Sequence, residues 1–468
     1  MDFTKLYING EWISPLTKEF IEVIDPANEE IIGKVPRSGE EDVNLAVKSA
    51  KEALEEWQDT APEERIKLVQ KLSEEMEKRA EEFSDMIVKE LGRGKKFALD
   101  YHTLPYIEDT NNFIKIAKSY EFEENFGDYL IRKEPVGVVA ALTPWNYPLG
   151  QITSKVIPAL LAGNTLVLKP SQQTPMVAYI LADAVHSAGF PKGVFNLVTG
   201  AGSEVGNILT EHKDVNMVTF TGSTKSGREV AKKSMGTVKR ITLELGGKSP
   251  AIILKGADLE NALKRTLNSV YNNTGQTCSA YTRLLVHEDE REAIEKAVVE
   301  MTAKYKFGDP KASPTNIGPL VSENQYKKVK AYIEKGLEEG ARLIYGEIPE
   351  KKEKGYYVNP VVFTDVSNDM TIAREEIFGP VLSIISYKDE ADAVKIANDT
   401  EYGLAAAVFG PEKEARAIAR KLKAGNVLVN KGRGSNDAPF GGFKQSGLGR
   451  EGGVYGLEEF LEIKAIFE

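Results

Sequence analysis

The sequence predicts an α/β protein with two doubly wound domains and a small additional β element. Three observations support this fold class. Continuous apolar runs alternate with helical stretches from residue 136 onward, and the alternation starts again after Gly246-Gly247. Residues 121–133 are polar and alternating, as expected for a hairpin or arm outside the main body. Alternating strands and helices are typical of βαβ units, which build parallel sheets.

The first 120 residues predict small antiparallel strands followed by helices. Residues 6–34 contain short alternating apolar runs, broken by Asn-Gly and Asp-Pro turn signals. Residues 40–57 have helical spacing, with their apolar side chains on one face. A second helix is expected to begin with Thr60 as its N-cap and Pro62 in its first turn, and helical patterning continues to about residue 120.

A series of buried strands follows, each a continuous apolar run of the kind that is covered on both faces. In the first set, strands are expected at 136–142, 165–168, 194–198, 217–220 and 241–245, with helices at 151–162, 175–188, 203–211 and 225–235. In the second set, strands are expected at 251–254, 284–287, 381–387 and 426–430, with helices at 258–272, 288–306, 324–339, 389–399 and 412–424. Each set therefore predicts a parallel sheet with helices on both faces.

Composition argues against several classes of partner. The net charge is −10 and charges of both signs are mixed along the chain, which disfavours nucleic acid. No run approaches the roughly 18 apolar residues that span a bilayer. The first residues, Met1-Asp2-Phe3-Thr4-Lys5, contain no apolar signal core. We therefore expect a cytoplasmic protein that binds neither nucleic acid nor membrane.

Cys278 is the only cysteine among the 468 residues, so it cannot form an intramolecular disulfide or a cysteine-based metal site. The four histidines are scattered, and no metal site is expected. Free cysteine is often a small buried hydrophobe. Here its neighbours, Asn272-Asn273-Thr274-Gly275-Gln276-Thr277 and Ser279, are polar and turn-forming. We therefore expect a loop that exposes Cys278 to a ligand as a candidate nucleophile.

Polar residues follow several expected strands at their C-terminal ends, where open parallel sheets bind ligands. Asn146 offers an amide that could stabilise an oxyanion, although an Asn between prolines is more often a turn residue. Lys169 places a cation where a ribose or phosphate would lie. Residues 200–206 nearly match a dinucleotide-binding glycine motif, and residues 220–224 precede a helix whose N-terminal amides could receive a phosphate. Because such polar residues and motifs recur at the ends of several strands along one edge of the sheet, they favour a nucleotide-binding site.

Two acidic positions are also candidates. Glu244 lies inside Thr242-Leu243-Glu244-Leu245, where partial desolvation would raise its pKa and suit a general base. A strand-end glutamate that points into water is the alternative. Glu375-Glu376 precedes an expected strand, where a ribose contact or a helix cap would both fit.

Together these motifs resemble the aldehyde dehydrogenase superfamily. Seven segments match in the family's order and span almost the whole chain, which is far more specific than any single motif. They are Pro144-Trp145-Asn146, Leu168-Lys169-Pro170-Ser171, Phe220-Thr221-Gly222-Ser223, Leu243-Glu244-Leu245-Gly246-Gly247-Lys248, Gly275-Gln276-Thr277-Cys278, Glu375-Glu376-Ile377-Phe378-Gly379-Pro380 and Pro439-Phe440-Gly441-Gly442-Phe443-Lys444-Gln445-Ser446-Gly447.

The resemblance implies an aldehyde dehydrogenase-like fold with two Rossmann-like domains and a small β oligomerisation element. Residues 1–120 and 137–246 would form the NAD(P)-binding domain, and residues 247–440 the catalytic domain. Residues 121–136 and 455–468 would form the oligomerisation arm and tail of a homodimer or homotetramer.

The resemblance also implies NAD(P)-dependent oxidation of an aldehyde to the free acid. Cys278 would attack the aldehyde, and Asn146 with the Cys278 backbone N–H would hold the oxyanion. Glu244 would activate the water that cleaves the thioester. No histidine lies in these motifs, so thiolate formation would rely on Glu244, water or the positive charge of the cofactor.

The residues implied for cofactor binding lie at the strand ends of the first domain and in the Glu375-Glu376 motif. Lys169 and Glu376 would hold the riboses, Ser223 would contact the pyrophosphate, and Trp145 and Phe378 would wall the cleft. The full expected set is Thr143, Pro144, Trp145, Lys169, Ser171, Gln172, Gly202, Phe220, Gly222, Ser223, Leu245, Gly246, Glu376 and Phe378.

Gln172 departs from the family pattern. Many NAD-specific members carry a glutamate three residues after the lysine that matches Lys169. A carboxylate there would bind the adenosine 2′-hydroxyl and repel a 2′-phosphate, whereas the neutral Gln172 amide removes the repulsion. We therefore expect NADP to be tolerated, with NAD slightly favoured.

The expected substrate funnel is more polar than a fatty-aldehyde tunnel. This favours a small polar aldehyde or a semialdehyde. Arg433 could pair with a substrate carboxylate, and a surface arginine on a glycine-rich loop is the alternative. The expected lining is Tyr147, Gln151, Ser154, Thr277, Ser279, Arg433 and Asn436.

Two rival functions differ in what they require of Glu244 and Cys278. CoA-acylating or phosphorylating relatives generally lack the glutamate at the Glu244 position, because a thiol or phosphate resolves their thioester. A non-catalytic member that serves as a binding or structural protein would be expected to lose Cys278 or Glu244. Both residues are present, which favours hydrolysis and release of the free acid.

Overall fold

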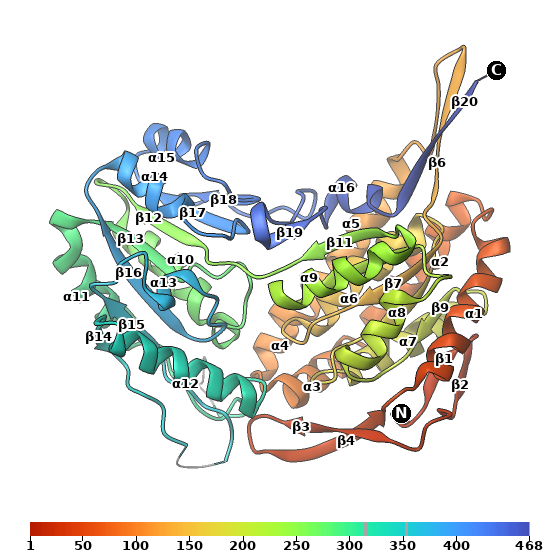
Figure 1. Ribbon diagram of the computed structural model, residues 1–468, viewed down its shortest axis with the longest axis horizontal. Coiled ribbons are helices and arrows are strands. Elements are labelled where there is room, and N and C mark those ends of the chain that lie inside the picture. The colour runs from red at the N-terminus through yellow and green to blue at the C-terminus, as the bar shows by residue number, and fades with distance from the viewer. Residues whose placement is uncertain (313–316, 352–353, 468) are drawn as a thin grey trace.

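Two large sheets form the body of the protein in the computed structural model (Figure 1). The structure describes residues 1–312, 317–351 and 354–467. Within these ranges the first sheet has eight strands: β1 (Leu6–Ile8), β2 (Glu11–Ile13), β7 (Val138–Leu142), β8 (Thr165–Lys169), β9 (Phe195–Leu197), β10 (Met217–Thr221), β11 (Arg240–Glu244) and β19 (Gly447–Leu448). The strands lie in the order β19-β11-β10-β7-β8-β9-β1-β2, with β7 to β11 parallel and the outer strands β1, β2 and β19 paired antiparallel to their neighbours.

The order of the parallel strands predicts where a ligand binds. The chain moves outward from β7 in one direction through β8 and β9, and then in the other through β10 and β11. The strand order therefore reverses between β7 and β10, and open α/β sheets bind ligands beyond the C-terminal ends of strands at such a point. The segments that follow β7 and β10 are the expected cofactor segments at residues 143–146 and 222–223.

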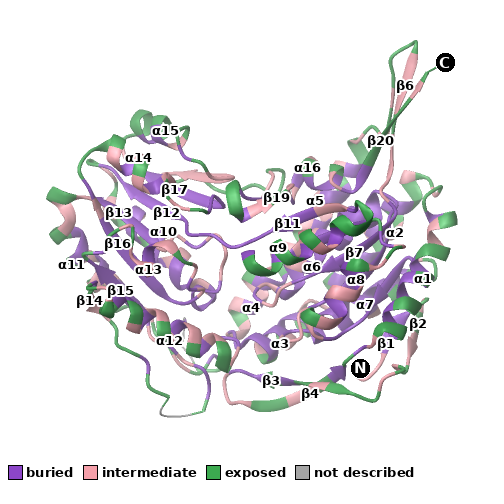
Figure 2. Ribbon diagram, in the orientation of Figure 1, coloured by how far each residue is buried: buried purple, intermediate pink, exposed green. Residues whose placement is uncertain are grey.

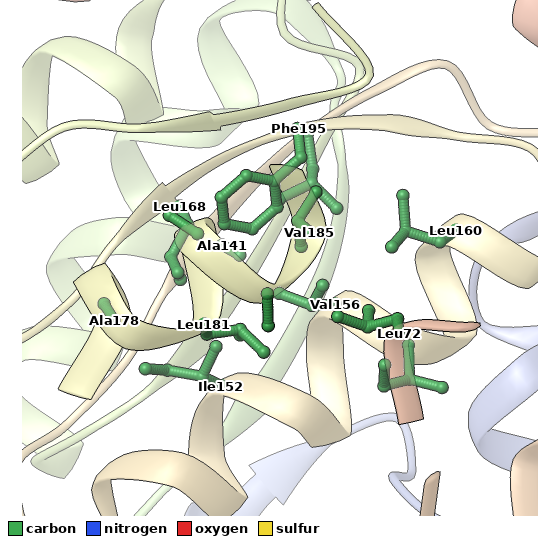
Figure 3. Packing of buried hydrophobic residues seen from close by; sticks show 14 of the residues in the cluster. Leu72, Ala141, Ile152, Val156, Leu160, Leu168, Ala178, Leu181, Val185 and Phe195 are labelled. Atoms are coloured by element: carbon green, nitrogen blue, oxygen red, sulfur yellow. The ribbon is translucent and has the colours of Figure 1, made fainter. Parts of the chain in front are cut away.

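Helices cover both faces of this sheet. They are α1 (Glu40–Trp57), α2 (Pro62–Lys78), α3 (Ala80–Leu91), α4 (Lys95–His102), α5 (Leu104–Ser119), α6 (Pro148–Leu161), α7 (Met176–Ala188), α8 (Asn207–Glu211) and α9 (Thr224–Ser234). Because side chains alternate along a strand, Val139 and Ala141 of β7 join a core with α2, α5, α6 and α7, whereas Val138, Ala140 and Leu142 join one with α1 and α8. Figure 3 shows the first of these cores, where residues of α6 and α7 pack against the sheet.

The second sheet is built in the same way. Within the described residues its strands are β12 (Pro250–Ile253), β13 (Arg283–His287), β14 (Arg342–Tyr345), β15 (Val361–Thr364), β16 (Val381–Tyr387), β17 (Ala405–Phe409) and β18 (Asn426–Val429). They lie in the order β14-β15-β16-β13-β12-β17-β18, and all but β14 run parallel. The helices of this region are α10 (Leu259–Tyr271), α11 (Arg291–Thr302), α12 (Glu323–Glu338), α13 (Thr371–Arg374), α14 (Glu390–Asn398) and α15 (Glu412–Ala419).

The expected arm and tail lie together in a third sheet. Strand β20 (Leu461–Phe467) pairs antiparallel with β6 (Tyr129–Pro135), which pairs with β5 (Glu123–Asn125). This sheet projects from the body, and its residues are mostly exposed or partly buried (Figures 1 and 2). Residue 468 of the expected tail lies outside the described residues. The domain boundaries drawn from the sequence stay a prediction.

The remaining elements are small. Strands β3 (Phe20–Asp25) and β4 (Glu30–Pro36) form an antiparallel pair, and helix α16 (Gly453–Glu458) precedes β20. None of the helices in the described part of the chain combines the length and hydrophobicity that crossing a membrane requires. Within the same residues, no group of three His, Cys, Asp or Glu side chains is arranged to hold a metal ion.

Some local predictions were wrong. The N-cap of α2 is Ala61, not Thr60, whose hydroxyl instead donates to the Glu56 carbonyl at the end of α1 at 3.3 Å. The helix expected at 203–211 begins as a π-helical turn at Gly202–Gly206 before α8, and α15 ends at Ala419 rather than near 424. Strands β14, β15, β17 and β19 were not predicted, because they are short or, as in Ala405-Ala406-Ala407, lack β-branched and aromatic residues.

Candidate active site

Cys278 lies in the segment that follows α10, and tight backbone packing fixes that segment. Gly275 has φ +73°, and a Cβ there would lie 2.1 Å from the Gly379 carbonyl oxygen, so only glycine fits. The Gln276 side chain accepts from the Val321 N–H at 2.9 Å and donates to the Asn273 carbonyl at 3.0 Å. Asn273, Thr274 and Gln276 are therefore buried, and Cys278 itself is partly buried. The expected exposure of Cys278 to a ligand stays a prediction.

The environment of the Cys278 thiol keeps it protonated in this structure. Burial raises its pKa to about 12, and the negative charges of Glu376 and Glu244 contribute to the rise. The backbone N–H groups of Ser279 and Cys278 oppose it by donating toward the sulfur. Two carboxylates of the predicted site thus lie close enough to influence the nucleophile.

Asn146 is held against the cysteine segment by a small hydrogen-bond network. Its Nδ2 donates to the Gln276 carbonyl at 3.1 Å. Asn273 Nδ2 donates to the carbonyls of both Asn146, at 2.8 Å, and Gln276, at 3.1 Å. Asn273 adopts φ 52°, a left-handed conformation that asparagine tolerates better than most residues. This network places the Asn146 amide beside the segment that carries Cys278.

Glu244 ends β11 and is 4% exposed, so it does not point into water. Neither carboxylate oxygen has a hydrogen-bond partner in the described structure. Burial raises its pKa well above the ordinary 4.5, and the charge of Glu451 raises it further, while Lys155 and Arg450 lower it. Gly441 leaves room for this carboxylate, because a Cβ there would lie 2.5 Å from Glu244 Oε1.

A buried ion pair lies near Glu244 and was not predicted from the sequence. Lys155 of α6 pairs with Glu451, and its Nζ donates to Thr221 Oγ1 at 2.7 Å. Lys155 is 1% exposed. No sequence motif points to Lys155, because it lies within a helix and its partners, Thr221 and Glu451, are distant in the sequence.

The expected ribose-binding residues lie at the sheet edge and in the segment between the two sheets. Lys169 Nζ donates to the carbonyls of Pro170, at 2.8 Å, and Gly200, at 3.2 Å, and burial lowers its pKa to about 8. Glu376 Oε1 accepts from the Gly247 N–H at 3.0 Å. Gly246 makes room for this carboxylate, because a Cβ there would lie 2.7 Å from Glu376 Oε2.

The expected phosphate and cleft residues also have definite positions. Ser223 is the N-cap of α9, with its hydroxyl accepting from the Ser226 N–H at 3.2 Å. Helix α9 therefore presents its positive end beside Ser223, as a phosphate site requires. The rings of Trp145 and Phe378 meet edge to face with centroids 5.3 Å apart. Thr143 Oγ1 is buried without a partner in the described residues, so a ligand could supply one.

The other expected cofactor residues line the same strand ends. Gly222 donates its N–H to the Glu244 carbonyl at 3.0 Å, and Leu245 donates to the Ser446 carbonyl at 2.9 Å. Gly202 is exposed at the start of the π-helical turn. The rest are partly buried around these strand ends: Pro144, Ser171, Gln172 and Phe220.

The expected funnel residues fall into two groups. The Tyr147 hydroxyl shares a hydrogen bond with Thr277 Oγ1 at 2.8 Å, immediately before the nucleophile. Gln151 and Ser154 follow on α6, and Ser279 adjoins Cys278, so these residues lie on the segments that carry the site. Arg433 and Asn436 instead lie in an exposed segment, and no contact brings them to Cys278.

Three further residues beside Tyr147 come from the N-terminal region: His102 at the end of α4, Tyr106 in α5 and Arg93 in the loop between α3 and α4. The His102 ring is buried and stacks on Tyr147, with centroids 4.6 Å apart and an interplanar angle of 12°. Burial and the Arg93 charge lower the His102 pKa to about 3, so it is neutral. Tyr106 packs on Gly150 of α6. No sequence motif marks these residues, which lie more than 170 positions before Cys278.

The chain is similar over nearly its full length to solved aldehyde dehydrogenases. A mutant of aldehyde dehydrogenase C from Pseudomonas syringae, in complex with NAD+ and octanal, is 42% identical with a TM-score of 0.98, and the match covers 99% of this chain and 96% of that one. An aldehyde dehydrogenase of Mycobacterium tuberculosis with NAD+ is 40% identical, with a TM-score of 0.97 and coverage of 100% and 98%. One from Bacillus cereus with NAD+ is 40% identical, with a TM-score of 0.96 and coverage of 100% and 96%.

The family comparison agrees with the fold and with the ordered motifs. The model of the aldehyde dehydrogenase family matches residues 12–466. The chain belongs to the aldehyde dehydrogenase family.

Proposed function

We propose that this chain oxidises an aldehyde to the free carboxylic acid with NAD+ or NADP+. The observation that carries the proposal is the position of Glu244. Its carboxylate is buried without a hydrogen bond, and its charge influences the thiol of Cys278. A carboxylate in that state is free to accept a proton from the thiol or from a water molecule.

The first half-reaction begins at the Cys278 sulfur. The thiol must lose its proton, because only the thiolate is an effective nucleophile. Its addition to the aldehyde carbon gives a thiohemiacetal oxyanion, which the Asn146 amide and the Cys278 backbone N–H would stabilise. The bound nicotinamide would supply the chemistry that the chain lacks, by accepting a hydride as the thiohemiacetal becomes a thioester.

The second half-reaction depends on Glu244. Ionised Glu244 would take a proton from water, and the resulting hydroxide would attack the Cys278 thioester to release the acid. Its raised pKa makes it a stronger base than an ordinary glutamate. Retention of this residue supports hydrolysis over transfer of the acyl group to CoA.

The residues around the strand ends fit a dinucleotide. The Ser223 end of α9 would receive the pyrophosphate, Lys169 and Glu376 would hold the riboses, and Trp145 with Phe378 would wall the nicotinamide side. We propose that NADP+ is tolerated, with NAD+ slightly favoured, because Gln172 carries no charge to repel a 2′-phosphate.

We also propose that the third sheet is an oligomerisation surface for a homodimer or homotetramer. It exposes large apolar side chains, with Phe126, Ile463 and Phe467 at 53%, 73% and 80%. Apolar residues gathered on a projecting sheet favour contact with another protein surface.

The decisive test is a panel of aldehydes assayed for NADH and NADPH formation, with the product acid measured and CoA present or absent. The proposal predicts free acid at the same rate with and without CoA. Strict dependence on CoA, or no reduction of either cofactor with any aldehyde, would contradict it.

A further inference from the structure

The ring of Tyr106 occupies the space that a side chain at residue 150 would fill. A Cβ on Gly150 would lie 2.2 Å from Tyr106 Cζ and 2.3 Å from its Cε1, which is well inside contact distance. Gly150 lies within α6, and its backbone has no positive φ that would require glycine. Glycine in a helix interior is normally destabilising. The absence of a side chain at this position is therefore explained by the hydroxyl end of the Tyr106 ring.

The helix face that carries Gly150 leads directly to the nucleophile. Tyr147, Gly150, Gln151 and Ser154 follow at helical spacing and share one side of α6. Tyr147 lies at the N-terminal end of this face, and its hydroxyl shares a hydrogen bond with Thr277, the residue before Cys278. Burial raises the pKa of the Tyr106 hydroxyl well above 10.0, and the charges of Tyr147, Asp109 and Cys278 raise it further. The Tyr106 hydroxyl thus lies in the same environment as the reactive thiol.

Two polar groups on this approach lack partners. Within the described residues Gln151 Oε1 is buried without a donor, and the hydroxyl of the partly buried Tyr106 has no hydrogen bond to another protein group. A tyrosine hydroxyl can donate a proton, and an amide oxygen can only accept one. A hydroxyl group on a ligand can accept from Tyr106 and donate to Gln151, whereas an alkyl chain would leave the buried Gln151 oxygen without a donor at a cost.

We propose that Tyr106, seated over Gly150, is a specificity-determining residue that selects short hydroxyl-bearing aldehydes and obstructs long alkyl chains. This inference rests on the proposed aldehyde oxidation and names its substrate class. The ring restricts the length of chain that passes α6, and its hydroxyl with Gln151 recognises the substrate hydroxyl.

The test compares matched aldehydes on wild type, Tyr106→Phe and Tyr106→Ala. The aldehydes are 2-hydroxypropanal and 3-hydroxypropanal, each against propanal, with octanal as the long chain. Wild type should prefer at least one hydroxyaldehyde over propanal by about tenfold or more in kcat/KM, the value of one added hydrogen bond. Tyr106→Phe should remove most of this preference by raising KM for the hydroxyaldehydes more than KM for propanal. Tyr106→Ala should raise kcat/KM for octanal by about tenfold.

Tyr101→Phe is the matched control, because Tyr101 lies five residues earlier and is 55% exposed. It should change none of these ratios. Tyr106→Phe keeps the ring, so it tests the hydroxyl even if Tyr106→Ala fails to fold. The inference is overturned if Tyr106→Phe slows propanal and the hydroxyaldehydes equally, or if wild type oxidises octanal as well as the hydroxyaldehydes. A wild type inactive on every aldehyde would instead overturn the proposed function, and this inference with it.

Discussion

The Glu376 carboxylate accepts a hydrogen bond from the Gly247 backbone N–H at 3.0 Å, and its charge also raises the pKa of Cys278. Gly247 lies between β11 and β12, where the chain passes from the first sheet to the second. Glu376 therefore links the expected ribose site to the protonation of the nucleophile. A ligand that engages this carboxylate would reduce its effect on the thiol.

Replacement of Glu376 by glutamine should make the resting thiol more reactive. With a pKa of about 12, roughly one thiol in 10,000 is ionised at pH 8. Loss of a nearby negative charge lowers that pKa, so the thiolate fraction at a given pH rises. Alkylation by iodoacetamide without cofactor should be several-fold faster in Glu376→Gln, with its rate–pH profile displaced to lower pH, and the KM for NAD+ should rise.

Glu375→Gln is the control for that experiment. Glu375 is exposed and accepts from the Tyr332 hydroxyl at 2.6 Å, and it is not among the groups that shift Cys278. Its alkylation profile should match wild type. An unchanged profile in Glu376→Gln would show that Glu376 does not control the thiol.

Gln172→Glu should convert tolerance of NADP+ into discrimination against it. A carboxylate near the adenosine ribose would repel a 2′-phosphate, so kcat/KM for NADP+ should fall at least about tenfold while that for NAD+ holds or rises. The neighbouring substitution Gln173→Glu adds the same charge and should leave the ratio near wild type. Steady-state kinetics with both cofactors measures the ratio of kcat/KM for NADP+ to kcat/KM for NAD+. If Gln172→Glu leaves this ratio unchanged, the adenosine ribose does not bind beside residue 172.

Gly150→Ala should be destabilising only when Tyr106 is present. In the wild-type background the new methyl meets the ring, and such overpacking costs about 1–3 kcal/mol. In a Tyr106→Ala background the clash is gone, and alanine in a helix is better than glycine by about 0.5–1 kcal/mol. Urea unfolding of wild type, Gly150→Ala, Tyr106→Ala and the double variant measures the coupling free energy between the two positions. Gly206→Ala is the control, because a Cβ there meets open space, and its effect on the free energy of unfolding should be the same with and without Tyr106→Ala. If the effects of Gly150→Ala and Tyr106→Ala on that free energy simply add, the ring does not pack against residue 150.

Glu451→Gln should destabilise the fold strongly, because it leaves the buried Lys155 ammonium without its charged partner. Breaking a buried pair from one side costs about 3–5 kcal/mol. The exposed Lys464–Glu134 pair is the comparison, and Glu134→Gln should cost less than about 1 kcal/mol. Unfolding free energies from urea titration measure both. Equal small losses would mean that the Lys155–Glu451 pair is not important for stability.

The sequence was sufficient to locate most strands of both sheets, because buried parallel strands are continuous apolar runs with polar residues at their ends, but it missed the short strands β14, β15 and β19 and the alanine-rich β17. It also marked Cys278, Glu244 and Asn146 as candidate chemical groups. It could not locate Tyr106, whose role depends on the packing of α5 against Gly150. It also gave no sign that polar residues before Cys278 are buried. Polar side chains such as Gln276 can be buried when the fold supplies hydrogen-bond partners from distant segments, and no local pattern records that.

A rapid-mixing experiment on Glu244→Gln tests both proposed steps, acylation of Cys278 and hydrolysis of the thioester with Glu244 as the base. Glutamine cannot take a proton from water, so steady turnover should fall by about 10²-fold or more. Acylation should still give a burst approaching one reduced cofactor per chain, and intact mass after acid quenching should show the acyl group on Cys278. Cys278→Ser should give neither burst nor adduct. Normal turnover in Glu244→Gln, or a burst retained in Cys278→Ser, would contradict the account.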